Sequence, residues 1–110
     1  MTYAVIWSEN GGPVYAGGLE LAVEWVVLAG TAPPALESGE KLFYEELADT
    51  WIERRPEARL RGLTTLVIER RNGTPLRIAS VQGVGALVEL VDRLAVARGR
   101  AALSQLANAR

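Results

Sequence analysis

The clearest alternation of hydrophobic and polar positions lies in two neighbouring runs, 64–71 and 75–81. Both are rich in β-branched and aliphatic residues, which favour strands, and they flank the dipeptide Asn72-Gly73. Asn-Gly between two such runs is the strongest short-range signal of a β-hairpin. The sequence therefore predicts two antiparallel strands joined by a tight turn.

The register of this hairpin follows from which residues share a face. A two-residue turn would place Ile68 opposite Arg77 and would mix apolar with charged side chains on both faces. A three-residue loop, 71–73, pairs Ile68 with Leu76 and gives one apolar face, so we predict this register. Gly73 is then expected in the left-handed conformation, as part of a glycine bulge. Four residues are predicted to face away from the core: Val67, Glu69, Arg77 and Ala79.

After this hairpin the hydrophobic period changes from two to between three and four, which predicts a helix over 84–98. Glu89 and Arg93 form an i, i+4 pair in the favourable order, and Gly99 stands where a C-terminal cap belongs. The chain beyond it, 100–110, is alanine-rich and is expected to be a weakly helical tail. The predicted core-facing stripe of the helix consists of Val84, Leu87, Val88, Val91, Leu94 and Ala95.

The first half of the chain reads as short strands separated by turn residues. These predicted strands are 3–8, 14–22, 25–31, 41–45 and 50–54. Gly17-Gly18 inside the second strand predicts a bulge or a sharp bend that curls the sheet. Two stretches, 19–29 and 38–55, also fit helical spacing, because short apolar runs are ambiguous by periodicity alone. Flanking glycines and a Trp-Val-Val cluster favour strands in the first stretch, whereas propensity alone would make the second a helix.

The three tryptophans differ in their predicted burial. Trp7 and Trp51 are expected to contribute core area. If the strand interpretation is right, Val23 and Trp25 stand at a hairpin tip whose connection, 22–24, contains none of the residues that tight turns prefer. An apolar tip with little to bury it marks a contact with another molecule. We therefore predict that Val23 and Trp25 form an interaction surface, the alternative being that the C-terminal tail covers Trp25.

The order of these elements, together with two short phrases, resembles the pleckstrin-homology-like (PH-like) superfold. It is closest in style to the short bacterial PH-like and GRAM-like domains. The phrases are Leu42-Phe43-Tyr44-Glu45-Glu46-Leu47 and Trp51-Ile52-Glu53-Arg54. In that superfold a phrase of hydrophobic, aromatic and acidic residues links two short strands, which is why we assign 41–45 and 50–54 to strands. The resemblance covers residues 3–98.

This resemblance implies an α+β fold: a strongly bent antiparallel sheet or partly open barrel of about seven strands, closed by one C-terminal helix. We expect a single domain over residues 1–99, followed by the tail 100–110. Members of the superfold mostly bind lipids, peptides or other proteins, so the resemblance implies a binding or scaffolding module. Its phosphoinositide-binding members use basic residues in the loop between the first two strands. Here that loop, 8–13, is acidic and has no lysine or arginine, which argues against headgroup binding at that place.

Composition narrows the chemistry further. The 110 residues carry 12 basic and 13 acidic side chains, and the net charge of −1 gives no global attraction to nucleic acid. The absence of cysteine and histidine removes disulfides, thiolate nucleophiles, the commonest metal ligand and the usual general base. The N-terminus, 1–7, has no basic leader and only a short apolar run, so we expect no signal peptide and a cytoplasmic location.

Two groups of charged residues are candidate sites. The densest basic group, whose guanidinium planes suit phosphate oxygens, is Arg54, Arg55, Arg59 and Arg61. Acidic residues, Glu53 and Glu57, are interleaved with them, so a solvated rim of surface ion pairs is the simpler interpretation. The carboxylates in one short span are Glu45, Glu46, Asp49 and Glu53, and they match no metal-binding or glycosidase pattern.

The sequence thus predicts a non-enzymatic binding or scaffolding module with no catalytic residue, metal or cofactor. Its expected partner is another protein, with a second copy in a homodimer as one case. Peripheral binding to anionic lipid through the arginines of 54–61 is the first alternative. A carboxylate-based, metal-dependent enzyme is the second.

Overall fold

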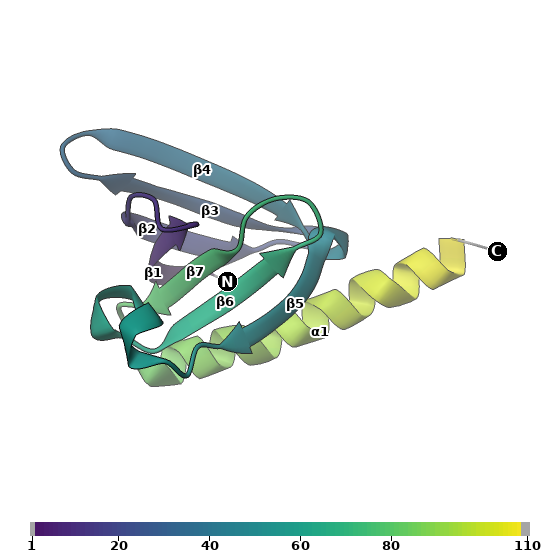
Figure 1. Cartoon of the computed structure of the whole chain (residues 1–110). Coiled ribbons are helices and arrows are strands. Elements are labelled where there is room, and N and C mark those ends of the chain that lie inside the picture. Colours follow the sequence, from purple (N-terminus) through teal and green to yellow (C-terminus); the bar gives the residue numbers. More distant parts are fainter. Residues whose placement is uncertain (1, 109–110) are drawn as a thin grey trace.

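The computed structural model describes residues 2–108 and contains one antiparallel sheet and one long helix (Figure 1). The strands are β1 (Thr2–Glu9), β2 (Tyr15–Leu21), β3 (Trp25–Ala32), β4 (Leu36–Phe43), β5 (Leu47–Ile52), β6 (Thr65–Arg70) and β7 (Leu76–Ser80), and the helix is α1 (Val84–Asn108). Short 3-10 turns connect some of them: η1 (Tyr44–Glu46), η2 (Pro56–Ala58) and η3 (Leu60–Gly62). The predicted α+β class is confirmed.

The strands follow the order β4-β3-β2-β1-β7-β6-β5, and every neighbouring pair is antiparallel. Because β1 lies in the middle, it joins the β1–β4 meander to the β5–β7 meander. The sheet curls into a half-barrel whose two edges are β4 and β5, and α1 closes it (Figure 1). In general shape this is the bent sheet with one closing helix that the PH-like resemblance implies.

The hairpin of β6 and β7 has the register predicted from the sequence. Ile68 pairs with Leu76, so the apolar side chains of the two strands share one face. Gly73 has a positive φ of 127°, in the region that favours glycine, as the three-residue loop requires. The Arg70 side chain also closes this loop, because its Nε donates to the carbonyl oxygen of Thr74 at 2.8 Å.

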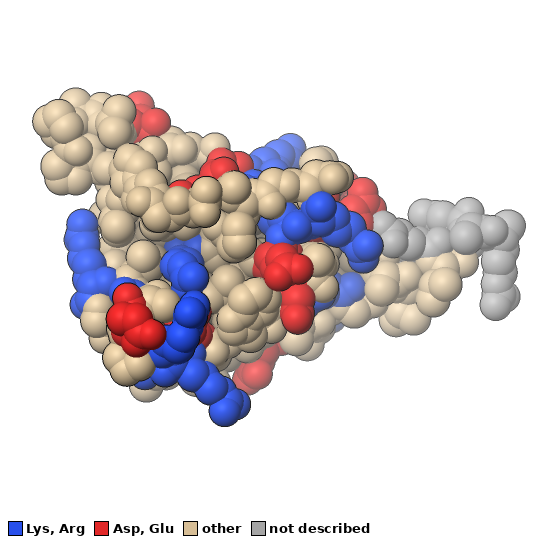
Figure 2. Space-filling model, in the orientation of Figure 1, with Lys and Arg blue, Asp and Glu red and all other residues tan. Residues whose placement is uncertain are grey.

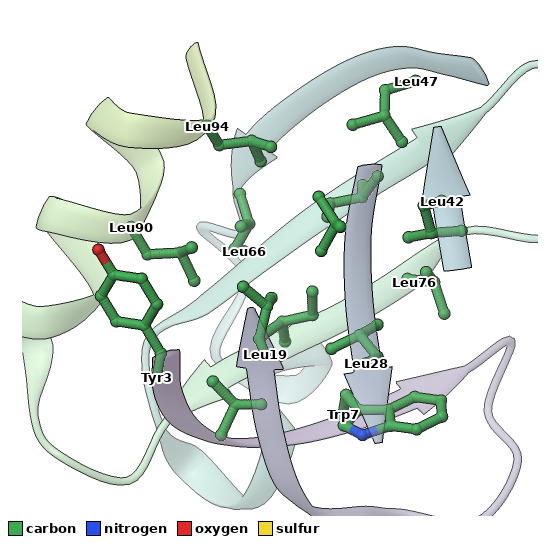
Figure 3. Close-up of a cluster of buried hydrophobic side chains, with 14 of the residues drawn as sticks. Tyr3, Trp7, Leu19, Leu28, Leu42, Leu47, Leu66, Leu76, Leu90 and Leu94 are labelled. Carbon is green, nitrogen blue, oxygen red and sulfur yellow. The ribbon is translucent and has the colours of Figure 1, made fainter. Parts of the chain in front are cut away.

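The main core lies between the concave face of the half-barrel and α1 (Figure 3). The strand residues in it are Tyr3, Val5, Trp7, Leu19, Val26, Leu28, Leu42, Leu47, Leu66, Ile68, Leu76 and Ile78. They meet three leucines of α1, Leu87, Leu90 and Leu94, all of which are buried. Full burial of such a side chain stabilises a fold by roughly 1.5–3 kcal/mol. The contact with α1 is therefore a large part of what holds the half-barrel in shape.

The helix is rotated relative to the predicted stripe. Leu87 and Leu94 face the core as predicted, but Val84 and Val88 are exposed, and Leu90 is buried instead. Apolar residues lie on two sides of α1, so spacing alone does not decide which side meets the sheet. The part of the prediction that placed Val84, Val88 and Ala95 in the core is wrong, because all three are exposed.

The convex face of the half-barrel carries a second, smaller cluster. Val67 and Ala79, predicted to face away from the core, do so but are 1 % and 0 % exposed, so they are not solvated. Ala79 packs with Ile6 and Leu60, and Leu60 belongs to η3. The Oγ1 of Thr65 accepts a hydrogen bond from the backbone N–H of Leu60 at 2.9 Å, which anchors this turn to β6. The segment between β5 and β6 is thus a cover for the sheet.

Both stretches that fitted either a helix or strands, 19–29 and 38–55, are mainly strands. β4 begins at Leu36, before the predicted residue 41, because it is an edge strand whose solvent side accepts polar residues. The link between β4 and β5 is the single turn η1.

A bulge in β5 decides which of its residues face inward. The pairing of β5 with β6 shifts register between Leu47 and Asp49. The residues after the shift exchange faces, so Thr50 pairs with the core residue Ile68 and Trp51 points to the convex side. Trp51 is 40 % exposed, and its predicted burial is wrong because the sequence pattern does not reveal the bulge.

The glycine pair in β2 permits a close approach of two strands rather than the predicted bulge. Both ladders of β2 run through Gly17 and Gly18 without a register shift, so the predicted bulge is wrong. A Cβ on Gly17 would overlap the carbonyl oxygen of Ala29 and would lie 2.6 Å from Cα of Gly30. Glycine is required there because the backbone of β3 occupies the space of a side chain.

The helix α1 continues through Gly99 to Asn108, so the predicted end at residue 98 and the glycine cap are wrong. Such a cap needs a positive φ, and Gly99 is not among the described glycines that have one. Most of the predicted tail, 100–110, is therefore helix, while residues 109 and 110 lie outside the described range. The last turns of α1 project beyond the sheet (Figure 1).

We predict that Gly17→Ala lowers the free energy of unfolding by about 1–3 kcal/mol, the usual cost of forcing extra atoms into a packed site. Gly18→Ala is the matched control, because a Cβ there would have its nearest neighbours at 3.7 Å, an ordinary contact. Urea denaturation followed by tryptophan fluorescence measures both. Equal midpoints for the two variants would contradict the close approach of β2 and β3.

Candidate interaction surface

The β2–β3 hairpin ends in an unusually tight apolar tip. The N–H of Ala22 donates to the carbonyl oxygen of Trp25 at 2.9 Å, which leaves Val23 and Glu24 as a two-residue loop. Neither is among the described residues with positive φ, so the tip is not one of the primed turns that two-residue hairpins favour. Val23 is 94 % exposed. The predicted tip therefore exists, with Val23 at its end.

The tip is held from behind by Tyr44, which lies in η1. Its hydroxyl donates to the carbonyl oxygen of Ala22 at 2.7 Å, and its backbone N–H donates to that of Glu24 at 3.2 Å. Burial raises the pKa of the Tyr44 hydroxyl, so it stays protonated and remains a donor. Two hydrogen bonds from one buried residue fix the loop, so Val23 is presented by an ordered backbone.

Trp25 lies beside the tip and is half-buried. Its ring meets that of Phe43 edge-on, with centroids 5.5 Å apart and planes at 80°. The Nζ of Lys41 lies 3.5 Å from the centroid of the Trp25 ring, in cation–π geometry. The partial exposure predicted for Trp25 is observed, and what covers it is β4. The side chains form an aromatic patch with a positive charge above it.

A groove separates the tip from α1, and we call it the tip groove. Its volume is about 890 Å³. The hairpin side is lined by 21–24 and the helix side includes Ala97, Arg100 and Leu103. A second hollow of about 670 Å³, the helix groove, continues along α1 and shares Arg100 with the first. Together they run from the hairpin tip along the outer side of the helix.

That outer side of α1 carries exposed apolar residues together with the charged Asp92 and Arg100. The exposed large hydrophobic residues on it are Val84, Val88, Val96, Leu103 and Leu106. Single exposed apolar residues are ordinary on a protein surface, whereas a row of them along one element marks a contact. The sequence prediction missed this row because it assigned Val84 and Val88 to the core.

One of the four arginines predicted as an anion site, Arg55, is engaged in an ion pair. Arg55 is turned toward the buried Glu53, with Nε donating to Oε1 at 3.0 Å. Arg77 of β7 binds the other carboxylate oxygen of Glu53 through Nη1 at 3.1 Å. Figure 2 shows acidic and basic side chains next to one another over the segment between β5 and β6. This agrees with a rim of ion pairs.

The other three predicted arginines are exposed. Arg61 has a positive φ of 48° and lines a small hollow with Pro33 and Pro34 of the β3–β4 turn. Arg54 and Arg59 are exposed, and their side chains form no ion pair with any residue in the range 2–108.

Within residues 2–108 no helix combines the length and apolarity that crossing a membrane requires.

The carboxylates predicted as a group are also separated. Glu53 is neutralised by Arg55 and Arg77, and Oδ1 of Asp49 accepts the backbone N–H of Thr50 at 2.8 Å. Over residues 2–108 no three carboxylates are placed to hold one metal ion.

An inward-facing charge cluster, not identified from the sequence, lies at the mouth of the half-barrel. Arg70 is only 10 % exposed in its side chain and pairs with Glu9 at 3.1 Å and with Glu40 at 3.8 Å. A hydrogen bond from Thr74 lowers the pKa of Glu9, while burial and the neighbouring Glu9 raise that of Glu40. The sequence signal was the alternation of side chains between the two faces of a strand. Glu9 lies two residues after the inward-facing Trp7, and Arg70 lies two residues after Ile68, so both face inward.

We predict that Glu53→Gln flattens the acid end of the stability curve. Hydrogen bonds from Arg55 and then Arg77 lower the pKa of Glu53 to about 2. The pKa of Glu53 in the folded chain is thus lower than its pKa in the unfolded chain, which is about 4.3. The ion pairs of Glu53 therefore stabilise the fold fully above about pH 4.3, and this stabilisation is lost as the pH falls toward 2. Thermal melts between pH 5 and 2 measure the effect. Glu57→Gln, which removes an exposed carboxylate of the same segment, should keep the wild-type slope.

Comparison with known proteins gives no relative from which a role could be transferred to this surface. No protein-family model matches the chain, and no curated protein matches it. The candidate interaction surface is therefore defined by the geometry of this chain: the apolar tip at Val23, the aromatic patch at Trp25 and the outer side of α1.

Proposed function

We propose that this protein is a non-enzymatic, PH-like binding module that docks a protein partner through the tip at Val23 and Trp25. The observation that carries the proposal is the exposure of Val23 on a loop fixed by Tyr44. An ordered apolar tip binds at low entropic cost, because its backbone is already in one conformation before the partner arrives. Full burial of a valine side chain contributes about 1.5–3 kcal/mol.

The surroundings of the tip favour a protein over a small molecule. The aromatic patch contains Trp25 and Phe43, with Lys41 above the Trp25 ring, and aromatic residues are enriched in protein interfaces. The tip groove beside it is open, and its lining combines apolar residues with Glu24, Glu45 and Arg100. A peptide segment or a helix of a partner suits this form better than an enclosed ligand does.

The half-barrel with one closing helix supports a binding role by analogy with PH-like domains, which carries modest weight because one fold serves many functions. A second candidate is peripheral contact with anionic lipid. The observation that favours it is the exposure of Arg54 and Arg59 without an ion-pair partner in residues 2–108. Arginine suits phosphate oxygens, but two separated side chains offer only weak binding.

The test compares Val23→Asp with Val81→Asp, a matched change at another exposed valine. Cell extracts passed over immobilised wild type should yield a retained protein, identified by mass spectrometry. Val23→Asp should weaken that retention at least roughly tenfold, since it places a charge in an apolar contact, and Val81→Asp should leave it unchanged. Equal retention by both variants would refute the tip as the contact.

Liposome sedimentation separates the lipid alternative. Vesicles with and without anionic lipid are mixed with wild type and with an Arg54→Glu, Arg59→Glu double variant. We expect no co-sedimentation of the wild type. Binding that depends on anionic lipid and is lost in the double variant would replace the protein-docking proposal with the lipid one.

A further inference from the structure

We infer that the partner is a second copy of this chain, and that the two copies pair their α1 helices in antiparallel orientation about a two-fold axis at Val96. The inference rests on the proposed protein-binding role and names the partner for it. Its basis is a row of exposed residues one turn apart on α1: Val88, Asp92, Val96 and Arg100.

The first argument is that α1 has large apolar residues that this chain leaves exposed. Val88 and Val96 are both 55 % exposed, and Leu103 and Leu106 are more so. The turns that carry the two leucines project beyond the sheet (Figure 1). Helical turns without tertiary contacts are marginally stable in water, and an amphipathic face packed on another element is what normally sustains them. A second helix on this side would provide that contact.

The second argument is the placement of two opposite charges. Asp92 and Arg100 lie four residues before and after Val96, on the same side of the helix, and both are exposed. Neither forms an ion pair or a side-chain hydrogen bond with any residue whose side chain the structure describes. The neighbouring arginines are occupied, since Arg93 binds Glu89 at 3.0 Å and Arg98 binds Thr50 at 3.2 Å. The row therefore carries one charge of each sign without an ion-pair partner among the described side chains.

Symmetry turns these two charges into a specific pairing. In a two-fold interface the same patch serves both subunits, and antiparallel helices crossing at Val96 bring each Asp92 opposite Arg100 of the other copy. Two ion pairs form, one on either side of a Val96–Val96 contact. A parallel arrangement would instead place Asp92 against Asp92 and Arg100 against Arg100, which repel. The charge pattern thus selects the antiparallel pair. A partner unrelated to this chain would not require opposite charges placed symmetrically on either side of Val96.

The third argument is space. The helix groove of about 670 Å³ lies beside this row and is bounded across from α1 by Leu21 of the β2–β3 hairpin. A helix of 25 residues is about 37 Å long, so an antiparallel neighbour seated there also reaches the tip at Val23. A stable interface covers roughly 1,600 Å² in total, which calls for the tip of each copy as well as its helix. The dimer therefore uses the surface of the proposed function.

Single-cysteine cross-linking tests the geometry, because the chain has no cysteine of its own. Val96→Cys places two thiols at the two-fold axis, where a mild oxidant should join more than half of the protein into disulfide dimers. Val88→Cys is the matched control, since it replaces an equally exposed valine. In the antiparallel pair its two thiols are about 24 Å apart along the axis, beyond disulfide reach. Cross-linking of both, or of neither, would overturn the arrangement.

Charge reversal tests the pairing by an independent route. Asp92→Arg and Arg100→Asp should each weaken dimerisation by roughly tenfold or more, because each converts both ion pairs into repulsions. An equimolar mixture of the two variants should restore the dimer, since every contact between unlike chains is again complementary. Light scattering reports the mass, either that of the 11.9 kDa chain or twice it. Arg59→Glu, a reversal outside the interface, should leave the wild-type mass unchanged.

The outcomes separate this inference from the proposed function. A wild type that stays monomeric, with no cross-link at Val96→Cys, refutes the dimer, and so does a mixture of charge variants that stays monomeric. In either case, retention of a different protein that is lost in Val23→Asp would leave the docking role intact. Dimers that persist in both charge variants refute the antiparallel pairing itself.

Discussion

The contact between three leucines of α1 and the concave face of the sheet is what the rest of this molecule depends on. A curled sheet with free edges at β4 and β5 leaves its inner side chains open to water, so it needs a lid. Leu87, Leu90 and Leu94 provide that lid, and Arg98 ties the same helix to β5 through Thr50. With the inner side of α1 committed in this way, its other apolar residues necessarily face solvent. The candidate interaction surface is a consequence of how the fold closes.

The half-barrel is closed differently at its other mouth. There, Arg70 bridges Glu9 of β1 and Glu40 of β4, and Thr74 adds hydrogen bonds to the same group. A nearly buried charge is tolerable only when it is paired. Because Arg70 pairs with Glu9 and Glu40, the strands β1, β4 and β6 can each carry a charged residue on the inner face of the sheet. One mouth is thus sealed by apolar packing and the other by a charge network. The convex face has its own cover in Leu60, which packs on Ile6 and Ala79.

Candidate site residues were predictable where a local signal was strong. Val23 and Trp25 stood out because the connection between their strands has no turn residues, and the structure places both at the predicted tip. Among the grouped arginines, Arg54, Arg55, Arg59 and Arg61, the structure pairs Arg55 with the buried Glu53, a contact that spacing in the sequence does not encode. The outer side of α1 and the Arg70 cluster went unnoticed. Both depend on which way an element is rotated or curled, and spacing does not encode that.

Local chemistry alone determined the hairpin of β6 and β7, including its register, because a slip of one residue would expose Ile68 and bury Arg77. It also determined the presence of a helix after this hairpin, since the hydrophobic period is a local property. The strands predicted at 41–45 and 50–54 rested on the PH-like resemblance instead, because propensity alone favours a helix there. Tertiary structure decided which stripe of α1 is buried, how far the helix continues past Gly99, and the face of Trp51 after the bulge in β5. Each of these is a choice between locally similar options, and only contacts between distant segments distinguish them.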